Sequence, residues 1–232
     1  PDKYPPEESH RLYTESYRLR KEAAERLHAD RMAFIRSHRQ SPLALYVANE
    51  MISKSFSVPA TDLEEILARN CRISDTARAA RFCRQAEQAR YFCKDIHYPD
   101  VPLHTPTFDT TLLSAHIRPG HVTLIDCWAS WCGPCRAAIP KVKALYDKYG
   151  RDRFDVISIS LDSKKEDWQK ALEEEKMPWP QFIAGNRGYK QLTSRYNISS
   201  IPNLILIDGK GQVVCNTFSP EEIRIELEQI LR

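Results

Sequence analysis

The sequence of 232 residues lacks several features that would point directly to a function. No apolar run approaches the roughly 20 residues needed to cross a bilayer, and there is no internal repeat or low-complexity segment. The 34 basic and 31 acidic residues leave a formal net charge of only +3, without the concentrated basic stripe of a nucleic-acid-binding surface. Zinc-ligand spacing is also missing, since the sequence contains no HxxxH, no HExxH and no second CxxC. We therefore expect no nucleic-acid partner, no metal and no cofactor.

The sequence does not reveal its cellular compartment directly. The chain begins at Pro1 rather than Met, and no apolar signal-like stretch follows. We expect any targeting segment to have been removed. The seven cysteines are an odd number, so at least one sulfur stays unpaired in any intramolecular disulfide scheme. This is not the composition of a disulfide scaffold, and each cysteine has to be considered by itself.

The first part of the chain, residues 1–98, is predicted to be a helical arm or small bundle. Apolar residues recur at intervals of three, four or seven, which is the spacing of a helix with one buried face. N-cap and capping-box patterns at Ser41-Pro42, Thr61–Glu64 and Ser74-Asp75 indicate where further helices begin. The predicted helices cover about 12–35, 42–54, 63–69 and 75–92.

The second part, residues 99–232, alternates between strand and helix patterns. Three prolines in residues 99–107 exclude a helix there, so we predict a domain linker. Beyond it we predict strands at 121–127, 154–161, 204–207 and 213–218. One predicted helix follows the first strand and the cysteine pair and ends at about residue 149. Further helices are predicted at 164–176, at 189–196 and from 220 onward. Strands that alternate with helices and end in a hairpin and a helix indicate a mixed α/β sheet.

The motif that indicates chemistry is Trp131-Cys132-Gly133-Pro134-Cys135, between a predicted strand and a predicted helix. Two cysteines three positions apart at a helix start can close a disulfide within one turn. The helix N-terminus stabilises an anion, so Cys132 is expected to ionise, and the thiolate is the species that attacks a disulfide. Cys135 lies inside the first turn and is suited to resolving a mixed disulfide. Gly133 leaves the attacking sulfur uncovered, and Pro134 limits the backbone freedom between the two sulfurs.

Two other interpretations of this pair compete with redox chemistry. A CxxC is half of many zinc sites, but a second ligand pair at suitable spacing is missing. A purely structural disulfide that closes so short a loop would stabilise the fold little through chain entropy. Redox chemistry is the interpretation that these residues favour.

The segment IDCWASWCGPCRAAIP closely resembles the active site of thioredoxins, and residues 99–232 resemble the TlpA/ResA-type branch of that family. Pro140 lies where thioredoxins kink the active-site helix. The stretch from Ser158 to Phe182 resembles an insertion of this branch, and Tyr196–Asn203 resembles the loop that carries the family's cis-proline. The resemblance implies a thioredoxin fold and an extracytoplasmic reductant. The helical first part resembles the variable arm of envelope relatives only weakly.

Several residues acquire a role through this resemblance. Asp126, on the strand beneath the dithiol, is expected to be buried with a raised pKa and to exchange a proton with Cys135; otherwise it is a hydrogen-bonded core residue. The resemblance also implies a cis bond before Pro202, so that the Ile201 backbone can pair with a client segment. Trp131 is predicted to contact the client. Ala138 departs from the branch, many of whose members have a glutamate at that position.

The predicted function is reduction of client disulfides in the periplasm or cell envelope. Its partners would be disulfide-containing proteins and an upstream thiol electron donor. The sequence leaves open whether that donor is bound to a membrane. The other interpretations are a disulfide isomerase, a binding or scaffold module with a vestigial dithiol, and a peroxide reductase. Peroxidases of this fold need a threonine or serine that follows a proline and lies a few residues before the attacking cysteine, a context that Trp131-Cys132 lacks. Cys127 and Cys215, in predicted strands, are expected to behave as small buried hydrophobes. For Cys71, Cys83 and Cys93 in the helical part, a second redox site is the less favoured interpretation.

Overall fold

The computed structural model describes residues 5–38, 41–53, 58–70, 77–150 and 153–232. The chain divides into two compact units between Cys93 and Lys94, slightly before the predicted boundary at 98/99. Residues 95–98 are drawn into the second unit by backbone hydrogen bonds. Asp95 N donates to Val213 O, Val213 N donates to Ile96 O, and Tyr98 N donates to Gly211 O. These bonds were not visible in the sequence because they join segments more than 100 residues apart.

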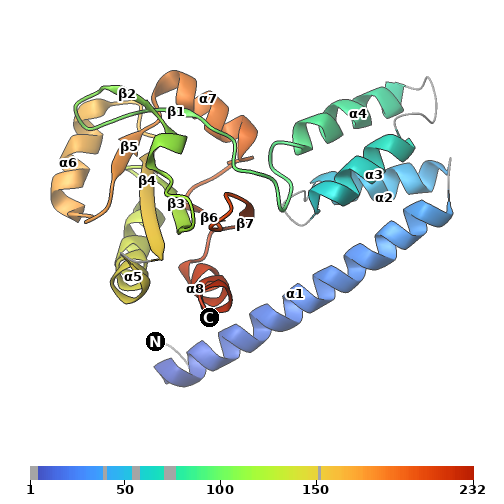
Figure 1. Ribbon diagram of the computed structural model, residues 1–232, viewed down its shortest axis with the longest axis horizontal. Coiled ribbons are helices and arrows are strands. Elements are labelled where there is room, and N and C mark those ends of the chain that lie inside the picture. The colour runs from blue at the N-terminus through green and yellow to red at the C-terminus, as the bar shows by residue number, and fades with distance from the viewer. Residues whose placement is uncertain (1–4, 39–40, 54–57, 71–76, 151–152) are drawn as a thin grey trace. The chain divides into compact units, whose positions relative to one another are not determined.

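The first unit consists of helices, as predicted. They are α1 Pro6–Ser37, α2 Pro42–Ser53, α3 Ala60–Asn70 and α4 Ala77–Ala89 (Figure 1). Helix α3 begins before the predicted start near Leu63, and α4 ends before 92 because the chain turns at Tyr91 and Phe92. The predicted end of the second helix at residue 54 and the predicted Ser74-Asp75 cap of the fourth helix lie outside the described residues. No helix in the described ranges is long and apolar enough to cross a membrane.

The second unit is built on one mixed sheet of seven strands in the order β2-β1-β5-β4-β3-β6-β7. The strands are β1 Pro102–His104, β2 Thr110–Leu112, β3 Val122–Trp128, β4 Phe154–Ser160, β5 Gln181–Ile183, β6 Asn203–Ile207 and β7 Val213–Thr217. Strand β3 runs parallel to β4 and antiparallel to β6. The parallel neighbours β3, β4 and β5 place their carboxyl ends at one edge of the sheet.

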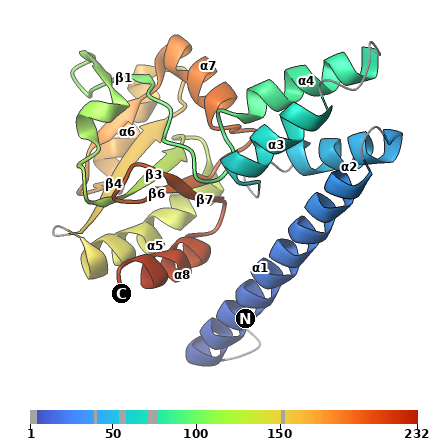
Figure 2. The same ribbon diagram turned by 45° about the vertical axis from the view of Figure 1, so that its right-hand side comes forward.

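Helices lie on both faces of this sheet. They are the short η2 Leu113–His116, then α5 Gly133–Tyr149, α6 Lys165–Glu175, α7 Gly185–Arg195 and α8 Pro220–Ile230. Figures 1 and 2 show α5 and α8 side by side below the sheet and α7 on its other side. The predicted mixed α/β architecture is therefore confirmed.

Three strands were not predicted, and two of them lie in or next to the segment interpreted as a linker. Strand β1 includes Pro102 and pairs antiparallel with β2 and with β5. A proline is tolerated here because it is the first residue of the strand. Each of the three strands has only three residues, too few to show an alternation pattern, yet Leu103 is fully buried.

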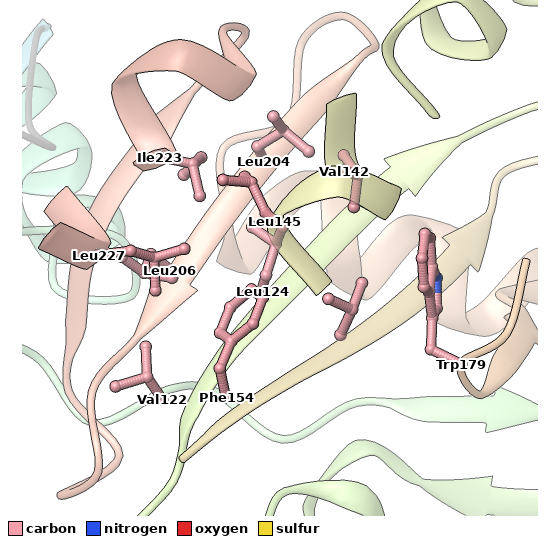
Figure 3. Packing of buried hydrophobic residues seen from close by; sticks show 11 residues of the cluster. Val122, Leu124, Val142, Leu145, Phe154, Trp179, Leu204, Leu206, Ile223 and Leu227 are labelled. Atoms are coloured by element: carbon pink, nitrogen blue, oxygen red, sulfur yellow. The ribbon is translucent and has the colours of Figure 1, made fainter. Parts of the chain in front are cut away.

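The main core of the second unit lies between the sheet and helices α5 and α8. Figure 3 shows Leu124, Phe154 and Leu206 from the strands meeting Leu145 and Leu227 from the helices. All five are buried. Strand β3 is buried along its whole length, which is why its sequence appears as a continuous apolar run with one internal carboxylate. This burial makes β3 a rigid support for the residues that follow it.

Candidate active site

The dithiol lies where β3 turns into α5. After Trp128 the chain makes a tight turn in which Cys132 N donates to Ala129 O at 3.0 Å. Cys132 is the N-cap of α5, and Pro134 occupies the first helical turn, where a missing N–H costs nothing. The strand therefore carries the first sulfur to the N-terminus of a helix.

Cys132 and Cys135 form a disulfide, with their Cα atoms 5.2 Å apart. The Cys135 N–H donates to Cys132 Sγ at 3.2 Å, so an amide at the helix N-terminus points at the first sulfur. Cys132 is 5% exposed and Cys135 is 2% exposed; both are largely covered in this oxidised form, and Cys132 is the more open. A Cβ added at Gly133 would meet no atom within 4 Å outside its chain neighbours, so the space at this glycine is open.

Asp126 lies on β3, six residues before Cys132, and only 4% of it is exposed. Burial raises the pKa of its carboxyl to about 6. Its Oδ2 accepts a hydrogen bond from Ser158 Oγ at 2.9 Å, and this bond works in the opposite direction on the pKa. The Ser158 hydroxyl also accepts from Trp179 Nε1 at 2.8 Å. The buried carboxylate is therefore held by a short chain of polar groups inside the sheet.

The predicted cis-proline loop is next to the dithiol. The peptide bond between Ile201 and Pro202 is cis, which confirms the expectation drawn from the resemblance. Ile201 packs against the buried cluster that contains Cys132 and Cys135. The cluster also includes Trp128, which is fully buried, and Trp168 of α6. Two segments almost 70 residues apart in the sequence thus meet at the redox centre.

A groove of about 620 Å³ includes Trp131 of the active-site turn in its wall, whereas neither Cys132 nor Cys135 lines it. Trp131 and Ile201 line it, together with the segment after β4 and the outer face of α7. Its apolar lining includes Leu161, Tyr189 and Ile198. Trp131 is 71% exposed, which is unusual for so large an apolar side chain. Of the predicted contact residues, the structure places Trp131 and Ile201 in one groove.

Residues 120–213 match the sequence profile of the family described as thioredoxin-like. The second unit of this chain belongs to the thioredoxin-like family.

Two relatives show what kind of proteins this thioredoxin-like unit is similar to. The thiol-disulfide oxidoreductase ResA of Geobacillus kaustophilus is 26% identical over 133 residues, which are 54% of this chain and 75% of that protein. The sporulation thiol-disulfide oxidoreductase A of Bacillus subtilis is 25% identical over 104 residues, or 44% of this chain and 61% of that protein. The matches thus leave part of each relative uncovered.

A solved structure supports the same assignment. The thiol-disulfide oxidoreductase of Bacteroides fragilis superposes with a TM-score of 0.52 at 25% identity, over 56% of this chain and 96% of that one. The predicted thioredoxin fold is therefore confirmed for the second unit, and so is the resemblance to ResA-type proteins. Thiol–disulfide exchange is the chemistry that the cysteine pair of this thioredoxin-like unit supports.

The remaining cysteines are not part of the dithiol. Cys127 is buried on β3, and burial raises the pKa of its thiol. Cys215 lies on β7, so both strand placements predicted from the sequence are confirmed, but Cys215 is only half-buried and the expectation of full burial was wrong for it. In the helical unit Cys83 is disulfide-bonded and Cys93 is buried. Cys71 lies outside the described residues.

Sequence reasoning missed the polar residues that surround the predicted site. Ser158 faces Asp126 because β3 and β4 pair in parallel with these two residues in register. Asp162 follows β4 and binds Ser130 of the active-site turn. A pairing of the two predicted strands would have found Ser158, whereas no local signal marks Asp162. Within the described ranges, no group of three or more His, Cys, Asp or Glu side chains is arranged to hold a metal ion.

Proposed function

We propose that this chain reduces disulfides in protein clients. The observation that carries the proposal is the amide of Cys135 directed at Cys132 Sγ at the start of α5. In the reduced protein the same N–H and the helix dipole would stabilise a Cys132 thiolate. Trp131, the residue before Cys132, lines the groove, so a Cys132 thiolate would be close enough to attack a disulfide in a chain bound there.

The reaction has two exchange steps. The Cys132 thiolate attacks one client sulfur; a Cys132–client disulfide forms, and the other client sulfur leaves as a thiolate that takes a proton. Cys135 then loses its proton and attacks Cys132 Sγ, which forms the Cys132–Cys135 disulfide and releases the second client thiol. Two electrons pass to the client, and an upstream dithiol must return two electrons and two protons to the enzyme.

Asp126 is proposed to accept the proton of Cys135 in the second step. A carboxyl with a pKa of about 6 is partly ionised near neutrality and can both take and return a proton. Ala138 supplies no second carboxyl, so this work falls on Asp126 with the help of water. The role of Trp131, Ile201 and Pro202 would be to hold an extended client segment beside Cys132.

We further propose that the protein works outside the cytoplasm, in the periplasm or envelope. The resemblance to the TlpA/ResA-type branch supports this location. The disulfide at Cys83 supports it independently, because structural disulfides persist in oxidising compartments. Disulfide-containing proteins as clients and a thiol donor upstream follow from the same proposal.

The proposal is tested by insulin reduction together with trapping. The native protein should reduce insulin, Cys132→Ser should be inactive, and Cys135→Ser should accumulate clients bound through Cys132. Cys215→Ser is the matched control, because it removes a thiol on β7 away from the dithiol. The reduction potential should lie near the thioredoxin value of about −270 mV. A reduction potential near about −120 mV would show that the protein is an oxidant of thiols. A native protein that does not reduce insulin would favour the alternative of a binding or scaffold module with a vestigial dithiol. Refolding of scrambled ribonuclease without net reduction would indicate an isomerase.

A further inference from the structure

A second buried carboxylate holds the turn that precedes the dithiol and is not used in the reaction described above. Asp162 follows the end of β4 by two residues and is 6% exposed. Its Oδ1 accepts from Ser130 Oγ at 2.7 Å, and its Oδ2 accepts from the Ser130 N–H at 2.9 Å. Ser160 Oγ donates to the same Oδ2 at 2.6 Å, and Asp162 N donates to Ser160 Oγ at 3.0 Å.

This arrangement is costly to build. A carboxylate removed from water is unfavourable unless several donors satisfy it, and here three donors converge on one side chain. Hydrogen bonds to a charged acceptor are stronger than neutral ones, so the group holds its donors tightly. Two of the three donors belong to Ser130, in the turn between Trp128 and Cys132.

The Ser130 contact determines where Trp131 can lie. The turn from Ala129 to Cys132 has one internal backbone bond, and Asp162 holds it from outside through both polar groups of Ser130. Trp131 is the next residue, and its large ring is mostly exposed, so the turn fixes the direction in which the ring projects. Asp162 and Trp131 line the same groove, so the carboxylate links the wall of the groove to the end of β4.

We propose that Asp162 is a positioning residue for client binding. Through Ser130 it holds the active-site turn so that Trp131 forms one wall of the groove, opposite α7. A protein or peptide disulfide, which extends into the groove, depends on that wall. A small disulfide, which meets only the sulfur of Cys132, depends on it much less. This inference rests on the proposed function, because it assumes that clients are disulfides bound beside Cys132.

The test compares a disulfide-linked peptide with a small aromatic disulfide as substrates. In Asp162→Ala the KM for the peptide should rise about tenfold, with a smaller change in kcat, and the rate with the small disulfide should fall much less. Ser130→Ala should act in the same direction. Ser130→Ala removes only the bond from Ser130 Oγ to Asp162 Oδ1, which Asp162→Ala also removes. Its effect should therefore be the smaller one, and the double variant should be little worse than Asp162→Ala alone.

Controls separate the possible failures. Asp167→Ala removes an exposed carboxylate from the first turn of α6 and should match the native protein with both substrates. Asp162→Asn keeps the side-chain shape and should retain part of the peptide affinity, which guards against a variant that fails to fold. The inference would be overturned if Asp162→Ala reduced the rates with both substrates equally or left the KM for the peptide unchanged. It would also be overturned if the losses of the two single variants added up in the double variant. A native protein that reduces neither substrate would instead overturn the proposed function.

Discussion

At the scale of single residues, two groups in the second unit have their acidity set by opposite environments. Cys132 lies at the N-terminus of α5, where the Cys135 amide donates to its sulfur and an anion is stabilised. Asp126 lies inside the sheet, where burial disfavours the anion and raises its pKa to about 6. In the reduced protein the surroundings of Cys132 would therefore favour a thiolate, whereas burial shifts the Asp126 carboxyl toward its neutral form. Such a division suits proton transfer near neutral pH.

The raised pKa of Asp126 predicts a pH dependence of stability. In the unfolded chain this carboxyl has its ordinary pKa of 3.8, and in the folded protein the pKa is about 6. The folded state binds the proton more tightly, so the free energy of unfolding is highest below pH 3.8 as far as this group is concerned. It falls as the pH rises through 6. Asp126→Asn should abolish this fall. At about pH 8 the free energy of unfolding of the oxidised variant should exceed that of the native protein by about 3 kcal/mol, since each unit of pKa difference corresponds to about 1.4 kcal/mol.

Denaturant unfolding of both proteins between about pH 3 and pH 8 would measure the effect. Ser158→Ala provides a second check, because the Ser158 hydroxyl lowers the pKa of Asp126. Loss of the Ser158 hydroxyl should move the fall in stability to higher pH, whereas Asp126→Asn should show no fall at all. Parallel curves for the native protein and Asp126→Asn would show that this carboxyl does not titrate in the range.

At the scale of elements, two helices are tied closely to their neighbours and thereby shape the site. Arg136 of α5 donates to Glu174 at 2.7 Å and to Glu175 at 2.6 Å, which joins the active-site helix to α6. On the other side of the sheet, α7 approaches β1 so closely that only glycine fits at position 188. A Cβ there would overlap the Pro102 carbonyl oxygen.

Gly188→Ala should therefore destabilise the protein, even though alanine is the better helix former by about 1 kcal/mol. The backbone oxygen of Pro102 cannot rotate away, so α7 or β1 must shift, at a net cost of about 1–3 kcal/mol. Because α7 also lines the groove, binding of a peptide disulfide should weaken as well. Thermal unfolding and peptide kinetics would measure the two effects. Ser194→Ala, on the exposed face of the same helix, should change stability by less than about 0.5 kcal/mol. A Gly188→Ala variant as stable as that control would contradict the close packing.

At the scale of the whole molecule, the chain consists of two units with separate cores. The redox centre, its groove and the sheet all lie after residue 93, and only the helical unit comes before it. Residues 95–98 belong to the sheet-containing unit through three backbone hydrogen bonds to residues 211–213. The dithiol chemistry should therefore be a property of the second unit, and the helical unit should contribute something other than the exchange reaction.

A comparison of two fragments tests this division. The fragment 94–232 should fold and reduce a small disulfide about as fast as the full chain. The fragment 99–232 lacks the three backbone hydrogen bonds made by residues 95–98, each worth about 0.5–1.5 kcal/mol. It should be less stable by about 1.5–4.5 kcal/mol. Denaturant unfolding of both fragments is the measurement. Equal stabilities would place the boundary after Tyr98, and loss of exchange in both fragments would show that the helical unit takes part in it.

Much of this protein follows from local sequence patterns. The spacing of Cys132 and Cys135 at a strand–helix junction defines the redox pair, because three residues span one helical turn whatever surrounds them. The long helices and the strands β3, β4, β6 and β7 are visible for the same reason, since each presents enough residues to reveal its period. The cis bond before Pro202 was expected from family resemblance, since the residues alone do not distinguish it from a trans bond.

The tertiary structure alone decided the contacts between segments that are distant in the sequence. Ser158 meets Asp126 only because β3 and β4 pair in one particular register, and Asp162 reaches Ser130 only because β4 ends beside the active-site turn. The groove needs four separate segments, and the short strands β1, β2 and β5 exist only as additions to a sheet formed elsewhere. Register and packing depend on the burial of the whole core, which no local window of the sequence contains.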